Sequence, residues 1–377
     1  MIKKLRLDTI LSKPAFLVSS KDFSLGWFAK TNQFFILEGL LESFFIQGQE
    51  MSEVDFNNTF QALLVEHPSL KIFLETLSVA NTIPNNFPPQ KNNYNTISKD
   101  TFTASTLKLS NEVLNAVYHN KQLQTLFQAP YKHLVSQNNV IHQEILIATA
   151  AENLDLYFNQ KHIYNCKMSD YYVLQAQFSN KITEVYHQIK APNWLSSFHA
   201  CAVQKNNKTF LLLGDSGAGK STLSSLLSLC GYRFIADDLV LMDHDLKIYD
   251  NPAAVSVKEN AWPVIDQYHN DFSSIKASDK TKGSTRIKYL PLHKIQNNRP
   301  TKFKVDALVW VHYNKNHNAE LFALEQKEML SRLIPDTWVN PRKATAQAFA
   351  DWALAIKSYQ LNYSDFKNAK ALLDAQL

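Results

Sequence analysis

A glycine-rich segment with one lysine and one serine is the first feature of this sequence that could do chemistry. Residues 214–221 read GDSGAGKS and fit the pattern GxxxxGK[ST]. In such a loop the glycines let main-chain N–H groups turn toward a polyphosphate, the lysine reaches the outer phosphates, and the hydroxyl completes the shell of a magnesium ion. We therefore expect binding of ATP and Mg²⁺ through Gly214, Asp215, Ser216, Gly217, Ala218, Gly219, Lys220, Ser221 and Thr222.

Two adjacent carboxylates, Asp237 and Asp238, stand sixteen and seventeen residues after Ser221. Phosphoryl transfer gives acids two tasks, which are to hold the metal ion and to accept the proton of an attacking hydroxyl. An Asp-Asp pair is also a common turn or helix cap, but the loop upstream favours catalysis. We expect both acids in the active site and place Asp238 with Ser221 on the metal, although the sequence does not decide which acid is the base.

The segments around these residues have the pattern of an α/β sheet. Residues 209–213 are an apolar run of strand length, and leucines recur at helical spacing over residues 222–229. A second short apolar segment, residues 232–236, leads into the acid pair. In doubly wound sheets ligand groups gather at the carboxyl ends of the strands. The acids are therefore expected to face the same crevice as the loop.

Residues 198–243 resemble the catalytic domain of the HPr serine kinase/phosphorylase family and its HPr-kinase-related members. The shared features are a histidine on a strand, a GxSGxGKS loop, a helix, and a strand that ends in Ala-Asp-Asp. The resemblance implies a fold like that of ATP-dependent phosphoenolpyruvate carboxykinase and phosphoryl transfer to a serine hydroxyl. It also implies that His199 lies in the active site with Asp237 and Asp238.

Two departures separate this chain from true HPr kinases. Thr222 stands where they carry glutamate, and no segment has their EIRGLGI-like signature. Residues 255–263 and 285–291 stand in its place and look like the related kinases of unassigned substrate. HPr itself as the acceptor, and the reverse phosphorylase reaction, are therefore not expected.

Two basic residues after the acid pair are further catalytic candidates. Lys258 and Arg286 could bring positive charge to the transferring phosphoryl group. Their alternative role is that of solvated surface charges. Residues 279–283, DKTKG, are polar and end in glycine, so we expect a mobile loop that orders over the nucleotide or the acceptor.

The N-terminal residues predict a small helical module. Apolar residues recur at helical spacing over residues 34–45, and Gly48 would end that helix. Ser52 and Asp55 form a capping box for a second helix, and a third is expected at 70–77. With a strand or hairpin before them, these helices are typical of a winged-helix-like module that docks a peptide or a protein. The alternative is a helical dimerisation domain, which would make the protein a homo-oligomer.

Residues 81–95, NTIPNNFPPQKNNYN, are rich in proline and asparagine and predict a linker. The predicted fold class is α/β, with a P-loop, phosphoenolpyruvate-carboxykinase-like kinase domain (residues 96–377) preceded by a small, mainly α winged-helix-like domain (residues 1–80). In the larger domain the patterns predict strands at 101–107, 143–149, 154–158, 171–178, 209–213, 232–236 and 305–311, and helices at 111–127, 179–189, 222–229, 328–333, 344–356 and 366–377.

Composition excludes several classes of protein. With 377 residues, of which 45% are hydrophobic and 19% charged, the chain can bury a large core. A net charge of +5 is too dilute to indicate nucleic acid or a membrane surface, and residues 34–77 have few basic side chains. Three cysteines without ligand spacing fit a reducing cytoplasm. No apolar run could span a membrane, and Asp8, Lys13 and Pro14 interrupt a signal-peptide pattern.

The favoured function is an ATP-dependent kinase that phosphorylates a serine-like hydroxyl on a peptide, a small protein or a metabolite. HPr-kinase-related proteins occur with winged-helix modules that recognise a leader peptide, and residues 1–80 resemble such a module, which would dock a peptide acceptor. Two alternatives stay open. A nucleotide-dependent regulator would bind ATP without transferring a group. A carboxykinase-like enzyme would need a second metal site, for which the chain shows no ligand-spaced cluster beyond His199.

Overall fold

The structure is a computed structural model that describes residues 13–67, 101–137, 140–189, 194–278, 285–292 and 302–376. The protein is mixed α/β with several sheets, as predicted. Its residue contacts divide the chain into two compact units, one of residues 1–86 and 325–356, the other of residues 87–324 and 357–377. The predicted third helix at 70–77, linker at 81–95 and mobile loop at 279–283 lie outside the described residues.

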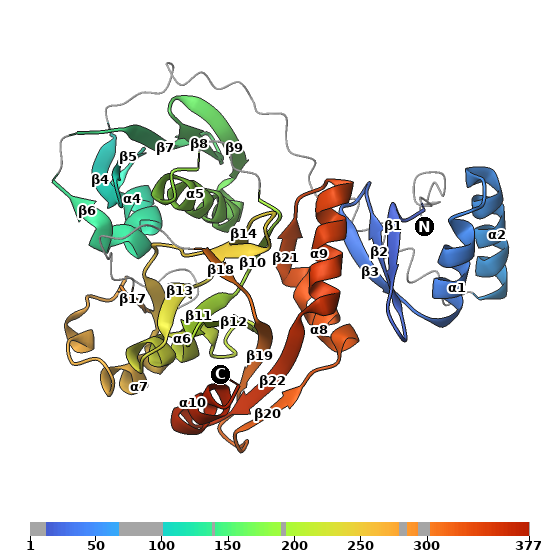
Figure 1. The fold of residues 1–377 in the computed structure, drawn as a ribbon. Coiled ribbons are helices and arrows are strands. Elements are labelled where there is room, and N and C mark those ends of the chain that lie inside the picture. Colours follow the sequence, from blue (N-terminus) through green and yellow to red (C-terminus); the bar gives the residue numbers. More distant parts are fainter. Residues whose placement is uncertain are drawn as a thin grey trace, which may run out of the picture. The chain divides into compact units, whose positions relative to one another are not determined.

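The first unit contains an antiparallel three-stranded sheet and two N-terminal helices (Figure 1). These elements are β1 Phe16–Ser19, β2 Ser24–Phe28, β3 Gln33–Leu37, α1 Gly39–Gly48 and α2 Glu53–Glu66. As predicted, α1 ends at Gly48 and Ser52 caps α2, where its hydroxyl oxygen accepts from the main-chain N–H of Asp55 at 3.1 Å. The core between the sheet and the helices is built from Phe28, Leu37, Phe44, Phe45, Phe56, Phe60 and Leu64.

The predicted helix over residues 34–45 is wrong in its first part. Residues 33–37 form β3, in which Phe34 lies opposite Trp27 of β2. Glu38 is extended and forms the N-cap of α1. The apolar residues of a half-buried strand run directly into those of a helix, so the combined pattern has helical spacing throughout.

Residues 325–356 complete the first unit. They form α8 Gln326–Leu333, β21 Thr337–Val339 and α9 Lys343–Ala355, which confirms the helices predicted at 328–333 and 344–356. Phe349 of α9 packs on Phe34 of β3 with ring centroids 5.3 Å apart, and Asn32 Nδ2 donates to the Val339 carbonyl at 2.7 Å. The predicted boundaries place this segment in the larger domain, whereas its contacts group it with the N-terminal sheet.

The second unit opens with a six-stranded sheet in the order β6-β4-β5-β7-β8-β9. Its strands are β4 Thr103–Leu109, β5 Glu112–Tyr118, β6 Val135–Ser136, β7 Gln143–Ala150, β8 Asn153–Phe158 and β9 Lys161–Lys167. Helices α4 Lys121–Gln128 and α5 Tyr171–Tyr186 pack on it through Leu123, Phe127, Leu174, Phe178 and Ile182. The strands predicted at 101–107, 143–149 and 154–158 are confirmed.

The single helix predicted at 111–127 is wrong. The segment forms β5 and then α4, and Asn120 caps α4 by accepting from the main-chain N–H of Leu123 at 2.9 Å. β5 is covered on both faces, since its neighbours Val113 and Leu114 are both buried. A strand buried on both faces shows no alternation of apolar and polar residues and is easily taken for a helix.

The strand predicted at 171–178 is also wrong, because these residues form the first half of α5. The aromatic and β-branched residues at its start favour a strand. The residues that pack on the sheet are Leu174, Phe178 and Ile182, and they recur every fourth position. Packing of this helical face overrides the local propensity.

The sheet that carries the candidate site has the order β13-β11-β12-β19-β22-β20 (Figure 1). Its strands are β11 Cys201–Lys205, β12 Lys208–Leu213, β13 Arg233–Ala236, β19 Ala307–Tyr313, β20 Glu320–Ala323 and β22 Lys357–Tyr363. β12, β19 and β22 are parallel, and two antiparallel pairings through β11 give β13 the same direction. The carboxyl ends of β13, β12, β19 and β22 therefore share one edge.

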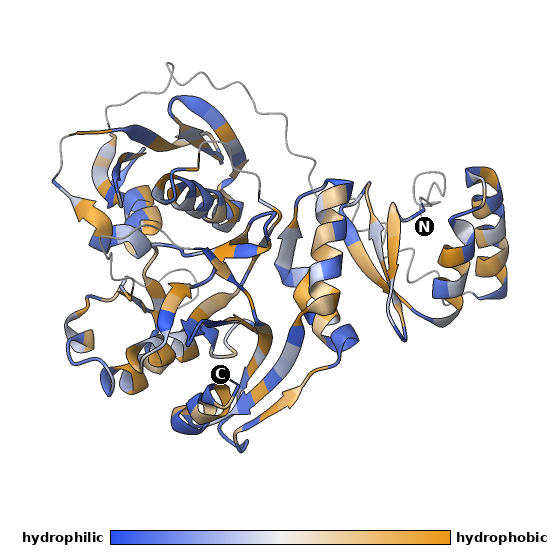
Figure 2. Cartoon of the chain, viewed as in Figure 1, coloured by the Kyte–Doolittle hydropathy of each residue, from blue (hydrophilic) through white to orange (hydrophobic). Residues whose placement is uncertain are grey.

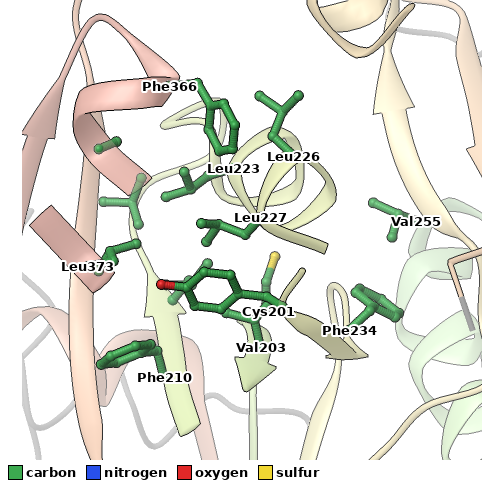
Figure 3. Packing of buried hydrophobic residues seen from close by; sticks show 14 of the residues in the cluster. Cys201, Val203, Phe210, Leu223, Leu226, Leu227, Phe234, Val255, Phe366 and Leu373 are labelled. Carbon is green, nitrogen blue, oxygen red and sulfur yellow. The ribbon is translucent and has the colours of Figure 1, made fainter. Parts of the chain in front are cut away.

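Helices α6 Lys220–Leu229 and α10 Phe366–Asp374 cover one face of this sheet. Figure 3 shows Leu223 and Leu227 on the side of α6 that is turned toward the strand residues Cys201 and Val203, and Leu226 belongs to the same buried cluster. Burial of these leucines stabilises α6 against the strands. The first turn of α6 is thereby held at the shared edge of the sheet.

Smaller elements surround this edge. β10 Ser196–Phe198, β14 Val240–Met242, β15 Lys247–Tyr249 and β18 Lys302–Lys304 pair antiparallel in the order β18-β15-β14-β10. β16 Val255–Lys258 pairs with β17 Ile287–Leu290, and α7 Trp262–Asp266 follows β16. The end of β16 brings Lys258 near the acid pair, whereas Arg286, which directly precedes β17, contacts Glu259.

Apolar and polar residues are separated along the N-terminal helices. Figure 2 shows orange and blue bands side by side on α1 and α2, as expected for helices that cover a core. Within the described ranges, no helix combines the length and the apolar character that crossing a bilayer requires.

Candidate active site

The loop of residues 214–219 joins β12 to α6, in the order that the sequence predicts. Gly214 has a φ of 149°, and a Cβ there would lie 2.6 Å from the Val311 carbonyl oxygen. Gly219 forms the N-cap of α6 with a φ of 95°, and a Cβ there would lie 2.8 Å from the Tyr363 hydroxyl. Both positions require glycine because of the backbone conformation and the close neighbour.

Lys220 is the first residue of α6, and it is only 7% exposed. Its Nζ donates to the main-chain carbonyl oxygens of Gly214 and Asp215. The loop's own oxygens therefore hold the buried ammonium group, as a buried charge requires. Phosphate oxygens in the loop would offer this group stronger, charge-assisted hydrogen bonds.

Ser221 and Asp237 are linked across the edge of the sheet. The Ser221 hydroxyl donates to Asp237 Oδ1 at 2.7 Å. The Cys201 thiol donates to the same oxygen at 2.7 Å, and the main-chain N–H of Ser256 donates to Oδ2 at 3.1 Å. Donors from α6, β11 and β16 thus fix the carboxylate that follows β13.

Asp237 is 5% exposed. Burial raises the pKa of this carboxyl above its ordinary value, the charge of Asp238 adds to the rise, and the three hydrogen bonds oppose it. Burial also raises the pKa of the Cys201 thiol well above its ordinary value, and the Asp237 carboxylate adds to that rise. Cys201 is therefore a protonated donor rather than a reactive thiolate.

Asp238 follows Asp237 directly and lies at the centre of a tight turn. It has a φ of 70°, and the N–H of Leu239 donates to the carbonyl of Asp237 at 2.8 Å, which closes a γ-turn around Asp238. A positive φ is uncommon outside glycine, and strained turns of this kind cluster at functional sites. The turn leaves 75% of the Asp238 side chain exposed.

His199 lies beside Asp238, in the connection between β10 and β11. Its Nδ1 is 3.1 Å from Asp238 Oδ1, and about half of the imidazole is exposed. The hydrogen bond from His199 lowers the pKa of Asp238 below its ordinary value, and the positive charges of Lys220 and Lys258 lower it further. The structure therefore groups His199, Lys220 and Lys258 around the exposed, ionised carboxylate of Asp238.

The two basic candidates differ in their surroundings. Lys258 ends β16 and is exposed, and its positive charge helps to lower the pKa of Asp238. The Arg286 Nε donates to Glu259 Oε2 at 3.0 Å, and its guanidinium lies 5.1 Å from the centre of the Trp262 ring. The structure thus places Lys258 with the acids and Arg286 with Glu259 and Trp262.

Two buried tyrosines feel the charge of Asp238 and have no recognisable sequence signal. Burial raises the pKa of Tyr131 and of Tyr289, and the negative charge of Asp238 adds to both rises. The Tyr131 hydroxyl donates to Ser179 Oγ at 2.8 Å, and Tyr289 lies opposite Ser256 in the β16-β17 pair. These residues are far apart in the sequence, so no local motif could reveal them. Cys201 could have been found from the sequence, since it follows His199 by two residues at the start of an apolar strand.

Oxygen donors at this edge suit a magnesium ion. Mg²⁺ keeps several waters and takes one or two carboxylates together with substrate phosphates, so it needs no cage of protein ligands. Ser221 Oγ and Asp237 Oδ1 lie 2.7 Å apart, so both oxygens could bind one magnesium ion. Among the described residues, no group of three or more His, Cys, Asp and Glu side chains is arranged to hold a metal by itself.

No protein-family model matches the chain, and no curated protein matches it. Among solved structures, it is similar to the Hpr(Ser) kinase/phosphatase from Coxiella burnetii, with 12% sequence identity over 48% of this chain and 95% of that chain. The TM-score of this match is 0.25. A similarity of this degree carries no argument about function, which is therefore inferred from the residues of the site.

Proposed function

We propose that this protein is a kinase that transfers the γ-phosphoryl group of ATP to a hydroxyl group. The observation that carries the proposal is the 2.7 Å hydrogen bond from Ser221 to Asp237, because it joins the glycine-rich loop to the acid pair. A loop alone would suffice to bind a nucleotide. Carboxylates beside it supply the groups that phosphoryl transfer needs for the metal and for the proton.

The loop binds the triphosphate. Main-chain N–H groups of residues 214–221 and the positive end of α6 attract the phosphates. Lys220 exchanges the carbonyl oxygens of Gly214 and Asp215 for phosphate oxygens, which removes a buried charge from neutral partners. The seven percent exposure of Lys220 supports this role, because the ammonium already lies within the loop.

Ser221 and Asp237 serve the metal side of the site. When bound, Mg²⁺ neutralises charge on the phosphates and on the transferring group. The sequence predicts Ser221 and Asp238 as the metal ligands. The hydrogen bond favours Asp237 for this task, because its Oδ1 already lies beside Ser221 Oγ. Cys201 and Ser256 act as positioning residues for the Asp237 carboxylate.

Asp238 serves the acceptor. Its exposed, ionised carboxylate accepts the proton of the attacking hydroxyl while the new O–P bond forms and the bond to the β-phosphate oxygen breaks, so that ADP leaves. His199 orients this carboxylate at 3.1 Å. Lys258 adds positive charge on the same side. The contacts of Arg286 with Glu259 and Trp262 favour a structural role over the predicted catalytic one.

The acceptor is a serine-like hydroxyl on a peptide, a small protein or a metabolite. A peptide acceptor would dock on the N-terminal unit, whose sheet and helices form a core of their own. The site does not distinguish among these three kinds of acceptor, because its groups act only on the proton of a hydroxyl and on phosphate oxygens.

The test follows radioactive phosphate from Mg·[γ-³²P]ATP into the peptide, protein and small-molecule fractions of a lysate. We expect label in one fraction with the wild-type protein, and its loss in Asp238→Asn and Lys220→Ala. The matched controls are Asp245→Asn and Lys208→Ala, which change exposed residues and should transfer label normally.

Saturable ATP binding without transfer to any fraction would contradict the kinase and support a regulator instead. Label transfer that survives Asp238→Asn would leave a kinase but remove the proposed base. Each result therefore bears on a different part of the proposal.

A further inference from the structure

An exposed tyrosine lies next to the glycine-rich loop, on the side away from the acid pair. Tyr313 is the last residue of β19 and is 42% exposed. In the sheet order β13-β11-β12-β19-β22-β20, the strand leading to the acids lies on one side of β12 and β19 lies on the other (Figure 1). The loop that follows β12 is thus flanked by Asp237 and Asp238 on one side and by Tyr313 on the other.

Tyr313 is in direct contact with the end of the loop. Its main-chain N–H donates to the carbonyl of Ala218 at 3.2 Å. A Cβ placed on Gly219 would lie 3.2 Å from Tyr313 Cβ, which is closer than ordinary packing allows. The Tyr313 side chain therefore lies beside Ala218 and Gly219, where the loop ends and α6 begins.

A buried neighbour holds Tyr313 in place. Tyr363 lies directly opposite it in the parallel register of β19 and β22, and the ring centroids are 5.4 Å apart at an angle of 66°. Tyr363 is 4% exposed, and burial raises its pKa above the ordinary value. A rigid ring in van der Waals contact with Tyr313 restricts its rotation, so the exposed side of Tyr313 is already oriented.

We propose that Tyr313 is the stacking platform for the base of the nucleoside triphosphate. This inference rests on the proposed function. The triphosphate lies in the loop with its γ end toward the acids, so the nucleoside leaves on the opposite side, where Tyr313 stands. Aromatic side chains bind bases of any sequence by stacking. A purine offers the larger stacking surface, which suits the ATP of the proposed function.

Inorganic tripolyphosphate separates the base from the phosphates, because it has the charge of the triphosphate and no base. The experiment measures the Kd of Mg·ATP and of Mg·tripolyphosphate by calorimetry, with wild type, Tyr313→Ala and Tyr313→Phe. We expect Tyr313→Ala to weaken ATP binding by roughly 5- to 150-fold and to leave tripolyphosphate binding unchanged. Tyr313→Phe keeps the ring and should bind both ligands like wild type. Tyr172→Ala, which removes a tyrosine exposed elsewhere in the same unit, is the control.

Three outcomes would overturn the inference. Unchanged ATP binding in Tyr313→Ala would show that the base does not stack there. Equal losses for ATP and tripolyphosphate would show that the substitution distorts the loop instead. A wild-type protein that binds neither ligand would contradict the proposed function as well, whereas the first two outcomes leave that function intact.

Discussion

Asp237 and Asp238 are adjacent in the chain, yet Asp237 is 5% exposed and 75% of the Asp238 side chain is exposed. The γ-turn around Asp238 produces this difference, since it directs successive side chains to opposite sides of the backbone. One carboxylate receives three hydrogen bonds inside the protein, and the other meets His199 at the surface. Two residues of the same type are thereby prepared for different tasks.

We predict that the two amide substitutions have different effects. Asp238→Asn should lower phosphoryl transfer by roughly 10²- to 10⁴-fold, the usual worth of a positioned acid or base, with little change in the Kd of Mg·ATP. Asp237→Asn should weaken ATP binding mainly when Mg²⁺ is present, because it disturbs Ser221. Calorimetry with and without Mg²⁺, together with label transfer, checks both. Identical profiles for the two variants would contradict the division of roles.

Cys201 is predicted to stabilise the protein through its hydrogen bond to Asp237. Cys201→Ala removes one donor from a buried carboxylate and should lower the free energy of unfolding by about 1–3 kcal/mol. Cys201→Ser keeps a donor and should lose less. Urea denaturation measures the three proteins, with Cys230→Ala, at a partly exposed position, as the control. A loss in Cys201→Ser as large as in Cys201→Ala would argue against the hydrogen bond.

Lys258 and Arg286 are predicted to separate in transfer assays. Lys258→Ala should slow transfer by roughly 10-fold or more, because the site loses a positive charge near the transferring group, while ATP binding stays close to wild type. Arg286→Ala should transfer normally, since its guanidinium is held by Glu259 and Trp262. Initial rates of label transfer check both. A larger loss in Arg286→Ala than in Lys258→Ala would restore the catalytic role that the sequence suggests for Arg286.

The strand, loop and helix around Lys220 could be predicted from the sequence because every constraint is local. Glycines at 214 and 219 fit positions where a Cβ would collide with a neighbour, and the leucines that follow repeat at helical spacing. The burial of β5 on both faces and the helical face of α5 depend on what packs against them. Periodicity therefore misleads at residues 111–127, and local propensity misleads at residues 171–178.

The surroundings of Asp237 depend on contacts that no local pattern encodes. Cys201 lies 36 positions before it and Ser256 lies 19 positions after it. Only the pairing of β11 with β13, and the approach of β16, bring these donors together. Tyr131 and Tyr289 could not be predicted as neighbours of the site, because they too are brought there by tertiary contacts. Motifs identify the residues that touch phosphate, and tertiary structure identifies the residues that position them.

Asp374, the last residue of α10, is predicted to make the free energy of unfolding depend on pH. Burial alone would raise its pKa, but hydrogen bonds from Lys205, Lys370 and Tyr232 lower it from 3.8 to about 2. Because the folded protein then favours the ionised form, the stabilisation is complete above pH 3.8 and is lost as the pH falls toward 2. Because solvent screens these partly exposed ion pairs, Asp374→Asn should cost about 1 kcal/mol near pH 6, and the difference from wild type should shrink in urea titrations at lower pH. Asp245→Asn, at an exposed position, should show no such trend. A difference between Asp374→Asn and wild type that stays constant across this range would mean that the ion pairs contribute nothing.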